Sequence, residues 1–189
     1  MEKSKFMFLD LLIFSILAGI AEFLSIFMFK IFSSGFYMSF SVMIIIISMV
    51  RWKYAGIAPA IVSGVVALIL NQFKILSETP MTIPHGILYY VVANCFVILA
   101  IPFFHKNWKD AMNKKSNFVI FIVLSFVFIA LGKGLMIFII NGALDGFLSY
   151  FTSTILTLVI SLILLLLFKS KTDLVVNMDD YIKHVQEED

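Results

Sequence analysis

The chain consists largely of apolar stretches long enough to cross a bilayer, separated by short polar loops. A transmembrane helix needs about 20 mostly apolar residues, and we predict about six, at residues 8–29, 36–50, 54–72, 84–104, 118–140 and 147–168. The apolar residues do not alternate with period two, which favours helices over a barrel. Charged residues make up 14% of the chain, well below the share of soluble domains. These features predict an all-α membrane protein, a bundle of about six transmembrane helices.

The distribution of lysine and arginine predicts the orientation of the bundle. With a cytoplasmic N-terminus, eleven of the 14 cations lie in cytoplasmic segments, Lys30 and Lys74 lie outside, and Lys133 lies within a span. The positive-inside rule then places both termini in the cytoplasm of a multi-pass protein of the cell membrane, with the lipid bilayer as its main partner. We expect Trp52 and Trp108 to anchor helices at the cytoplasmic interface. The sequence has no basic patch interleaved with aromatic residues, so we expect no nucleic-acid partner.

The loops are too short for a second folded domain. We expect a six-helix transmembrane domain over residues 1–168 and a polar cytoplasmic tail over 169–189. The single Cys95 excludes a disulfide within one chain. The three histidines are far apart in the sequence, so we expect no metal site and no cofactor.

Two charged residues fall inside predicted spans, where burial is costly and function is common. Glu22 lies slightly outside the middle of the first span, and Lys133 lies in the outer half of the fifth, at a similar depth. They are expected to form a buried structural ion pair or to bind a charged or zwitterionic ligand.

Other polar residues gather toward the outer ends of the later spans. Tyr90 and Asn94 share a face of the fourth helix, and Tyr150 and Thr154 begin a polar stripe on the sixth. Asn141 stands at the outer end of the fifth. Belt aromatics and hydrogen bonds between helices are the alternative explanation. Their convergence predicts an outward-opening cavity whose substrate-binding residues are Glu22, Tyr90, Asn94, Lys133, Asn141, Tyr150 and Thr154.

The first span carries small residues in its cytoplasmic half. Ser15 and Gly19 are four residues apart with Ala18 beside them, a spacing that lets helix backbones approach closely. This face is expected to dock a second membrane subunit or to pack within the chain.

These features together resemble the substrate-binding S components of energy-coupling factor (ECF) transporters. The resemblance rests on six spans in 189 residues, the small face of the first span, the turn from Arg51 to Gly56 before a Gly/Ala-rich third span, and the outward polar groups. Members of the family often carry Ala-xxx-Ala where this chain has Ser15-xxx-Gly19. The resemblance implies high-affinity binding of a small water-soluble vitamin or related micronutrient. It also implies partners for uptake, namely a coupling transmembrane subunit, which would dock at Ser15, Ala18 and Gly19, and two ATPase subunits.

Two other classes of function compete with this interpretation. The chain has no Walker-type phosphate loop and no Gly-x-Ser-x-Gly, so we expect no enzyme and no catalytic residues. An autonomous small secondary carrier or channel remains the main alternative, because Glu22 and Lys133 are also suited to gating or proton relay. Dependence on partner subunits distinguishes the two: an S component binds alone but transports only in a complex.

Overall fold

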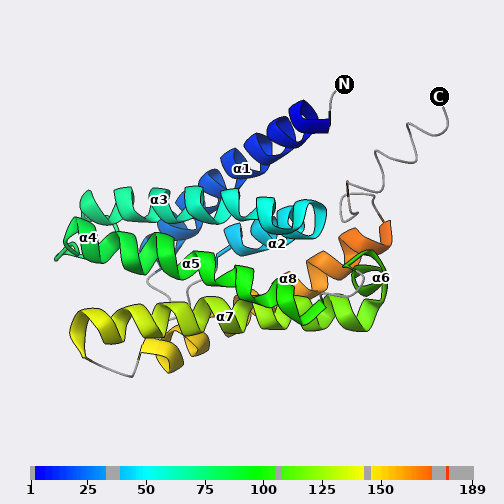
Figure 1. The fold of residues 1–189 in the computed structure, drawn as a ribbon. Coiled ribbons are helices and arrows are strands. Elements are labelled where there is room, and N and C mark those ends of the chain that lie inside the picture. The colour runs from blue at the N-terminus through cyan, green and yellow to red at the C-terminus, as the bar shows by residue number, and fades with distance from the viewer. Residues whose placement is uncertain (1–2, 33–38, 105–107, 143–145, 172–177, 179–189) are drawn as a thin grey trace.

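The computed structural model describes residues 3–32, 39–104, 108–142, 146–171 and 178, which contain helices, turns and loops and no strand. The helices form one elongated bundle (Figure 1). Those labelled α are α-helical, η1 and η3 are 3₁₀-helical, and η2 is π-helical. They are α1 (Lys3–Phe32), α2 (Ser41–Trp52), η1 (Lys53–Ile57), α3 (Ala58–Gln72), α4 (Ile83–Gly86), η2 (Ile87–Val92), α5 (Ala93–Cys95), η3 (Phe96–Phe104), α6 (Trp108–Asn113), α7 (Lys115–Asn141) and α8 (Gly146–Lys171).

The first three helices run up, down and up. Asp10 and Glu22 of α1 bond to Arg51 and Ser41 of α2, so these two helices are antiparallel. The chain then reverses at η1, where Lys53 has a φ of 51°. A Cβ on Gly56 would lie 2.4 Å from the carbonyl oxygen of Ser48, so only glycine fits this close turn.

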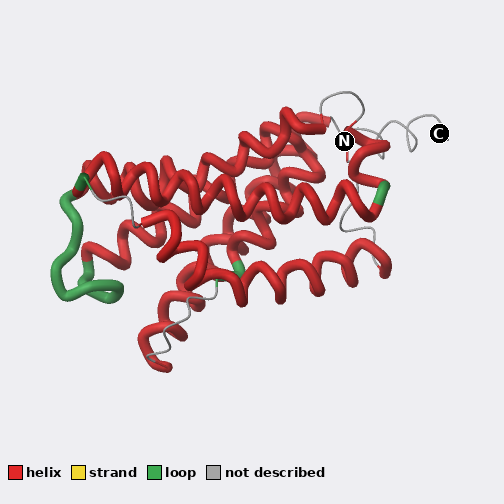
Figure 2. Tube along the Cα trace, turned by 90° about the horizontal axis from the view of Figure 1, so that it is seen from below, coloured by secondary structure: helices red, strands yellow, loops and turns green. Residues whose placement is uncertain are grey.

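The fourth helical run changes its pitch three times along its length. Residues from Ile83 to Phe104 form one continuous run in which an α-helical turn gives way to π-helical η2 and later to 3₁₀-helical η3. Pro102 lies inside η3, where its missing N–H and its ring disfavour regular α-helical bonding. Helices α7 and α8 then pack against each other on the side of the bundle away from α3 (Figure 1). In Figure 2 helices make up nearly all of the described chain, and a long loop lies at one end.

Four helical stretches of the described chain are long and apolar enough to cross a membrane: Lys3–Ile31, Ser41–Gln72, Ile83–Phe104 and Lys115–Asn141. Ser41–Gln72 contains the reversal at η1, so its two arms are the second and third predicted spans. The sixth corresponds to the shorter apolar helix Thr154–Ser170. An all-α membrane protein therefore fits the structure, and the positions of the predicted helices agree with it. The second begins at Ser41 rather than at residue 36.

One end of the bundle is fastened by an ion pair that the sequence did not suggest. The Arg51 guanidinium donates to both carboxylate oxygens of Asp10, over 2.8 and 3.0 Å, and the Trp52 indole N–H donates to the same carboxylate over 2.5 Å. The Trp108 indole N–H donates to the carbonyl of Val50 over 3.1 Å. Both tryptophans predicted to be interfacial anchors are buried within the bundle, and their N–H groups bond inside it.

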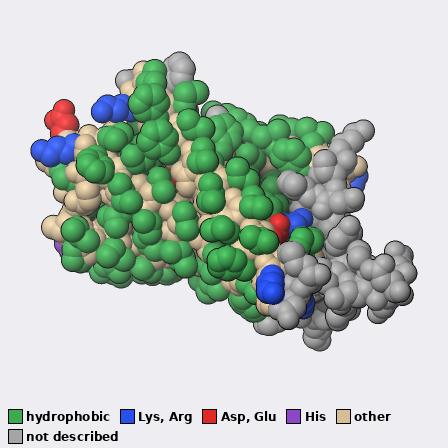
Figure 3. Space-filling model, turned by 90° about the horizontal axis from the view of Figure 1, so that it is seen from above, with side chains coloured by type: hydrophobic (Ala, Val, Ile, Leu, Met, Phe, Trp, Pro, Cys, Tyr) green, Lys and Arg blue, Asp and Glu red, His purple; other side chains and the backbone are tan. Residues whose placement is uncertain are grey.

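The outer surface is apolar over most of its area. Figure 3 shows hydrophobic side chains covering the face seen from above, with charged side chains gathered toward the two ends. Helix α1 exposes a large share of this surface, including Phe8, Ile16, Phe23 and Ile31. Such a surface suits lipid, while the polar residues inside the helices face one another in the interior.

Candidate functional site

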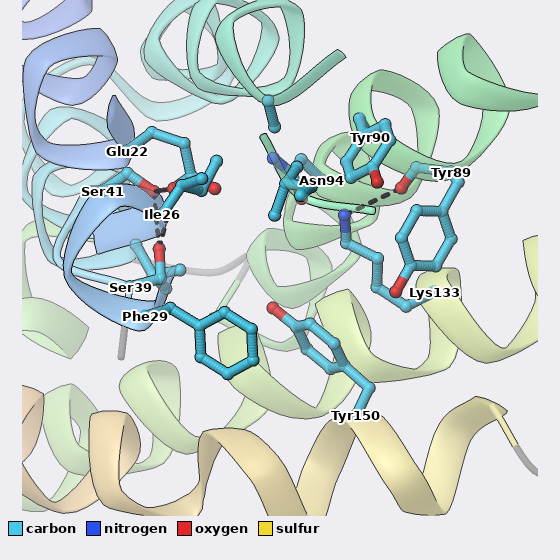
Figure 4. Close-up of a pocket in the computed structure, with 13 residues that line it drawn as sticks. Glu22, Ile26, Phe29, Ser39, Ser41, Tyr89, Tyr90, Asn94, Lys133 and Tyr150 are labelled. Carbon is cyan, nitrogen blue, oxygen red and sulfur yellow. Dashed lines mark hydrogen bonds between the residues drawn. The ribbon is translucent and has the colours of Figure 1, made fainter. Parts of the chain in front are cut away.

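A cavity of about 200 Å³ lies between the helices, and its polar lining sets it apart from the rest of the interior. Helices α1, α2, α3, α7 and α8, the run from η2 to α5 and the loop at 73–82 all contribute to its wall. Its polar lining residues are Glu22, Ser39, Ser41, Tyr89, Tyr90, Asn94, Lys133 and Tyr150 (Figure 4). The remaining lining is apolar and includes Phe29, Ile26 and Leu76.

Lys133 projects from α7 into a cluster of three tyrosines. Its ammonium donates to the carbonyl oxygen of Tyr89 over 2.8 Å. It also lies 4.4, 5.1 and 5.9 Å from the ring centres of Tyr89, Tyr90 and Tyr150. Contacts of this kind between an ammonium and aromatic faces are attractive and strengthen when water is excluded. With only 6% of its surface exposed, Lys133 thus has a well-defined position in the wall.

Glu22 occupies the wall formed by α1 and the start of α2. One of its oxygens accepts hydrogen bonds from the hydroxyls of Ser39 and Ser41, over 2.9 and 2.5 Å. The adjacent backbone is held as well, because the Ser39 N–H donates to the Thr157 hydroxyl of α8 over 3.2 Å. Acidic groups are favourable beside a helix N-terminus, so Glu22 also supports the first turn of α2.

Glu22 and Lys133 do not form the direct ion pair that was one of the two expectations. Among the described residues the contacts of Lys133 are to a carbonyl and to aromatic rings, with no carboxylate among them. Figure 4 shows the two side chains on opposite sides of the cavity, with the rings of Phe29 and Tyr150 to one side of the space between them. The cavity therefore has an acidic wall and a basic wall.

The π-helical turn of η2 explains how two consecutive tyrosines both reach this cavity. Tyr89 and Tyr90 lie in η2, and their rings meet edge to face with centres 5.0 Å apart. Turns of π-helix break the regular i to i−4 bonding pattern and are frequent at functional sites. Helix α3 approaches this turn closely, because a Cβ on Gly64 would lie only 2.5 Å from the Tyr90 carbonyl oxygen.

The loop at 73–82 contributes to the wall of the cavity. Its Leu76 lines the wall, and its far end is tied to α3, where the Asn71 side chain accepts from the Met81 N–H over 3.0 Å. Gln72 donates to the Met81 carbonyl over 2.8 Å. The end of α3 thereby fixes the position of the loop relative to the cavity.

Five of the seven predicted substrate-binding residues line this cavity, namely Glu22, Tyr90, Asn94, Lys133 and Tyr150. Thr154 and Asn141 do not. The Thr154 hydroxyl donates to the Tyr150 carbonyl of its own helix over 2.8 Å, so its polarity is used locally. Asn141 is exposed at the end of α7.

The three small residues predicted for docking are buried inside the chain. Ser15, Ala18 and Gly19 all have little exposed surface, and a Cβ on Gly19 would touch Val62 and Val66 of α3 at 3.5 and 3.4 Å. Close packing of α1 against α3 accounts for the small residue at Gly19. A partner that docks on α1 would meet the larger apolar side chains of its exposed face instead.

Sequence reasoning missed Ser39, Ser41, Phe29 and Leu76 as lining residues. The signal for the serines was present, because two hydroxyl residues lie at the start of an apolar helix and such residues favour helix starts. Their contact with Glu22 depends on how α1 and α2 fold together, which the pattern of one segment does not contain. Phe29 and Leu76 resemble any other apolar residue in the sequence.

The residues of this cavity are suited to binding. They offer an ammonium, a carboxylate, tyrosine rings and hydroxyls, and the Asn94 amide, which donates to Ser63 over 3.4 Å. No group of three or more His, Cys, Asp or Glu side chains suited to a metal ion occurs in the described part of the chain. His105 and nearly all of the expected tail lie outside that part.

No protein-family model, curated protein or solved structure matches this chain.

Proposed function

We propose that this chain is a membrane-embedded substrate-binding subunit, of the S-component type of ECF transporters, that captures a small water-soluble vitamin or related micronutrient for uptake. The observation that carries the proposal is the cavity of about 200 Å³ lined by a carboxylate, an ammonium and three tyrosines. Small-molecule sites combine an apolar enclosure with a few placed polar groups. Burying a charged side chain inside a membrane protein is costly, and such residues usually mark functional sites.

The orientation of the cavity supports capture from outside the cell. The cavity lies beside the second half of α1 and the loop at 73–82, since Phe29 and Leu76 line it. The ion pair between Asp10 and Arg51 lies near the start of α1. In Figure 1, α1 begins and α8 ends at the same end of the bundle, near α6. With the basic segments in the cytoplasm, the start of α1 and the end of α8 lie on the cytoplasmic side, the chain crosses the membrane six times, and the cavity lies in the outer half.

In this function the chain binds and does not catalyse. Energy for release would come from partner proteins, a coupling transmembrane subunit with two ATPase subunits. Docking on α1 would involve its exposed apolar face, which includes Ile13, Leu17 and Leu24.

The test begins with native mass spectrometry of gently purified protein, followed by extraction of small molecules from the same sample. We expect one vitamin-like metabolite bound at a one-to-one ratio and lost in Lys133→Met, whose unbranched side chain is one atom shorter and carries no charge. The matched control is Asp10→Asn, a change distant from the cavity, which should retain the metabolite.

Reconstitution distinguishes the proposed subunit from an autonomous carrier. Liposomes containing the chain alone should bind the extracted metabolite without accumulating it, because this function depends on partner ATPases. Accumulation by the chain alone would refute the subunit role and establish a carrier. A purified protein with no bound small molecule and no affinity for extracts of its own cells would refute binding as well.

A further inference from the structure

Lys133 is the one positively charged side chain among the described residues that line the cavity. A lysine ammonium has three N–H donors, and in Lys133 one of them is used by the Tyr89 carbonyl at 2.8 Å. Its other contacts in the described chain are the faces of tyrosine rings. These partners are all uncharged, so the ammonium keeps a positive charge and two donors for a molecule in the cavity.

Glu22, the negatively charged residue of the lining, is held by the chain itself. The hydroxyls of Ser39 and Ser41 donate to one of its oxygens over 2.9 and 2.5 Å. These bonds join the carboxylate to the start of α2, where an acidic group is favourable. The fold therefore accounts for Glu22 without a ligand, and the charge that a ligand would complement is that of Lys133.

Tyr90 adds a hydroxyl to the wall that Lys133 forms. Its ring centre lies 5.1 Å from the Lys133 ammonium, and Figure 4 shows its hydroxyl directed toward the part of the cavity that holds this ammonium. No described residue forms a hydrogen bond with the Tyr90 hydroxyl. Since a phenol hydroxyl is a donor as well as an acceptor, an anion in contact with Lys133 would have a second donor in Tyr90.

We infer that the ligand is a carboxylic acid that binds as a monoanion, with its carboxylate on Lys133 and the Tyr90 hydroxyl. The rest of the ligand is uncharged and packs against the apolar lining, which includes Ile26, Val42 and Leu76. This inference rests on the proposed binding function and names the substrate class of the same cavity.

The charge of the wall favours a carboxylate over the other groups that a small metabolite carries. A phosphate monoester has about 1.5–2 negative charges at neutral pH, and arginines or helix N-termini are its usual partners. The described lining contains no arginine, and its one ammonium offsets one negative charge. A carboxylate has that charge, and its two oxygens accept from the ammonium and from a hydroxyl. A neutral ligand would leave the buried ammonium without an anion, which is costly.

The test compares four probes of one chain length on the full-length protein in lipid nanodiscs: hexanoate, hexanamide, hexylamine and hexyl phosphate. Isothermal titration reports binding, and empty nanodiscs correct for partition of the probes into lipid. We expect hexanoate to bind about tenfold to a hundredfold more tightly than hexanamide, the range for a hydrogen bond to a charged group. Hexylamine and hexyl phosphate should bind more weakly than hexanoate, because the first repels Lys133 and the second carries an additional negative charge.

Three variants assign this preference to the wall. Lys133→Met should abolish the preference for hexanoate over hexanamide. Tyr90→Phe keeps the ring against the ammonium but loses the hydroxyl, so it should weaken hexanoate binding by about tenfold. Glu22→Gln removes a negative charge that faces the ligand across the cavity and should tighten hexanoate binding. The matched control, Asp10→Asn, converts a carboxylate of the same helix away from the cavity and should leave the probe preference unchanged.

Equal affinity for hexanoate and hexanamide, or tighter binding of hexylamine or hexyl phosphate, would overturn the carboxylate and leave the binding function standing. If no probe binds, the metabolite extracted from the purified protein decides the matter. A carboxylic acid would support the inference, and a metabolite without a carboxylate would overturn it. A purified protein that is empty and binds no probe would overturn both proposals.

Discussion

The ion pair between Asp10 and Arg51 predicts a large, purely structural effect. Asp10→Asn removes the charge opposite the guanidinium and one acceptor of the bidentate pair, whose distances are 2.8 and 3.0 Å. The side chains of Arg51 and Asp10 keep only 10% and 15% of their surface exposed. Breaking a buried pair on one side costs about 3–5 kcal/mol. Since the amide keeps an oxygen as an acceptor, we expect a loss near the lower end, about 3 kcal/mol.

The unfolding temperature of the purified protein measures this loss. At about 2–4 °C per kcal/mol for a chain of this size, Asp10→Asn should lower it by about 6–12 °C, with ligand affinity unchanged. The control is Glu22→Gln on the same helix, which should have the opposite profile, with a small change in stability and a large change in affinity. A decrease below about 2 °C for Asp10→Asn would refute the reasoning, because it would give this pair no more weight than an exposed one.

Gly64→Ala should lower both stability and ligand affinity, by about 1–3 kcal/mol for overpacking, because its methyl group would collide with the backbone of η2. Gly86→Ala is the control and should change thermal unfolding little, because its methyl group would displace only the movable end of Leu68 and would meet the Tyr90 ring at an ordinary contact distance of 3.8 Å. Trp108→Phe keeps an aromatic ring but loses the indole hydrogen bond, so denaturant titration should show a loss of about 1 kcal/mol. Asn71→Ala releases the end of the loop at 73–82, and hydrogen exchange should show faster exchange at the Met81 amide with little change in global stability.

The positions of the helices were predictable because hydrophobic length is a property of each segment alone. The runs ending at Gln72, Phe104 and Asn141 end in the structure close to where the sequence becomes polar. The start of α2 was not predictable in this way. The residues before Ser41 are apolar enough to extend a helix, whereas Ser39 and Ser41 are held at its start by Glu22 of another helix.

The candidate site was predictable in its membership more than in its geometry. Glu22 and Lys133 were identified because charge within an apolar run is rare. Whether they contact each other depends on helix rotation and on the π-helical turn of η2, and neither is encoded by sequence spacing. The bond of Asp10 to Arg51 and Trp52 escaped notice for the same reason, since it joins residues from two segments that each look like a helix end.

The burial of Lys133 in α7 has a consequence for synthesis of the protein. A lysine at the centre of a membrane-crossing helix adds about 2.5–3.5 kcal/mol to its insertion free energy, while each Leu, Ile, Phe or Val subtracts about 0.3–0.6 kcal/mol. About seven such residues therefore offset one lysine, and α7, the most apolar of the four long stretches, contains more than that. The exposed aliphatic residues of α7, such as Leu131 and Ile139, thus offset the cost of inserting the Lys133 ammonium into a bilayer. Polar substitutions there should cause degradation of the nascent chain before any defect in binding is seen.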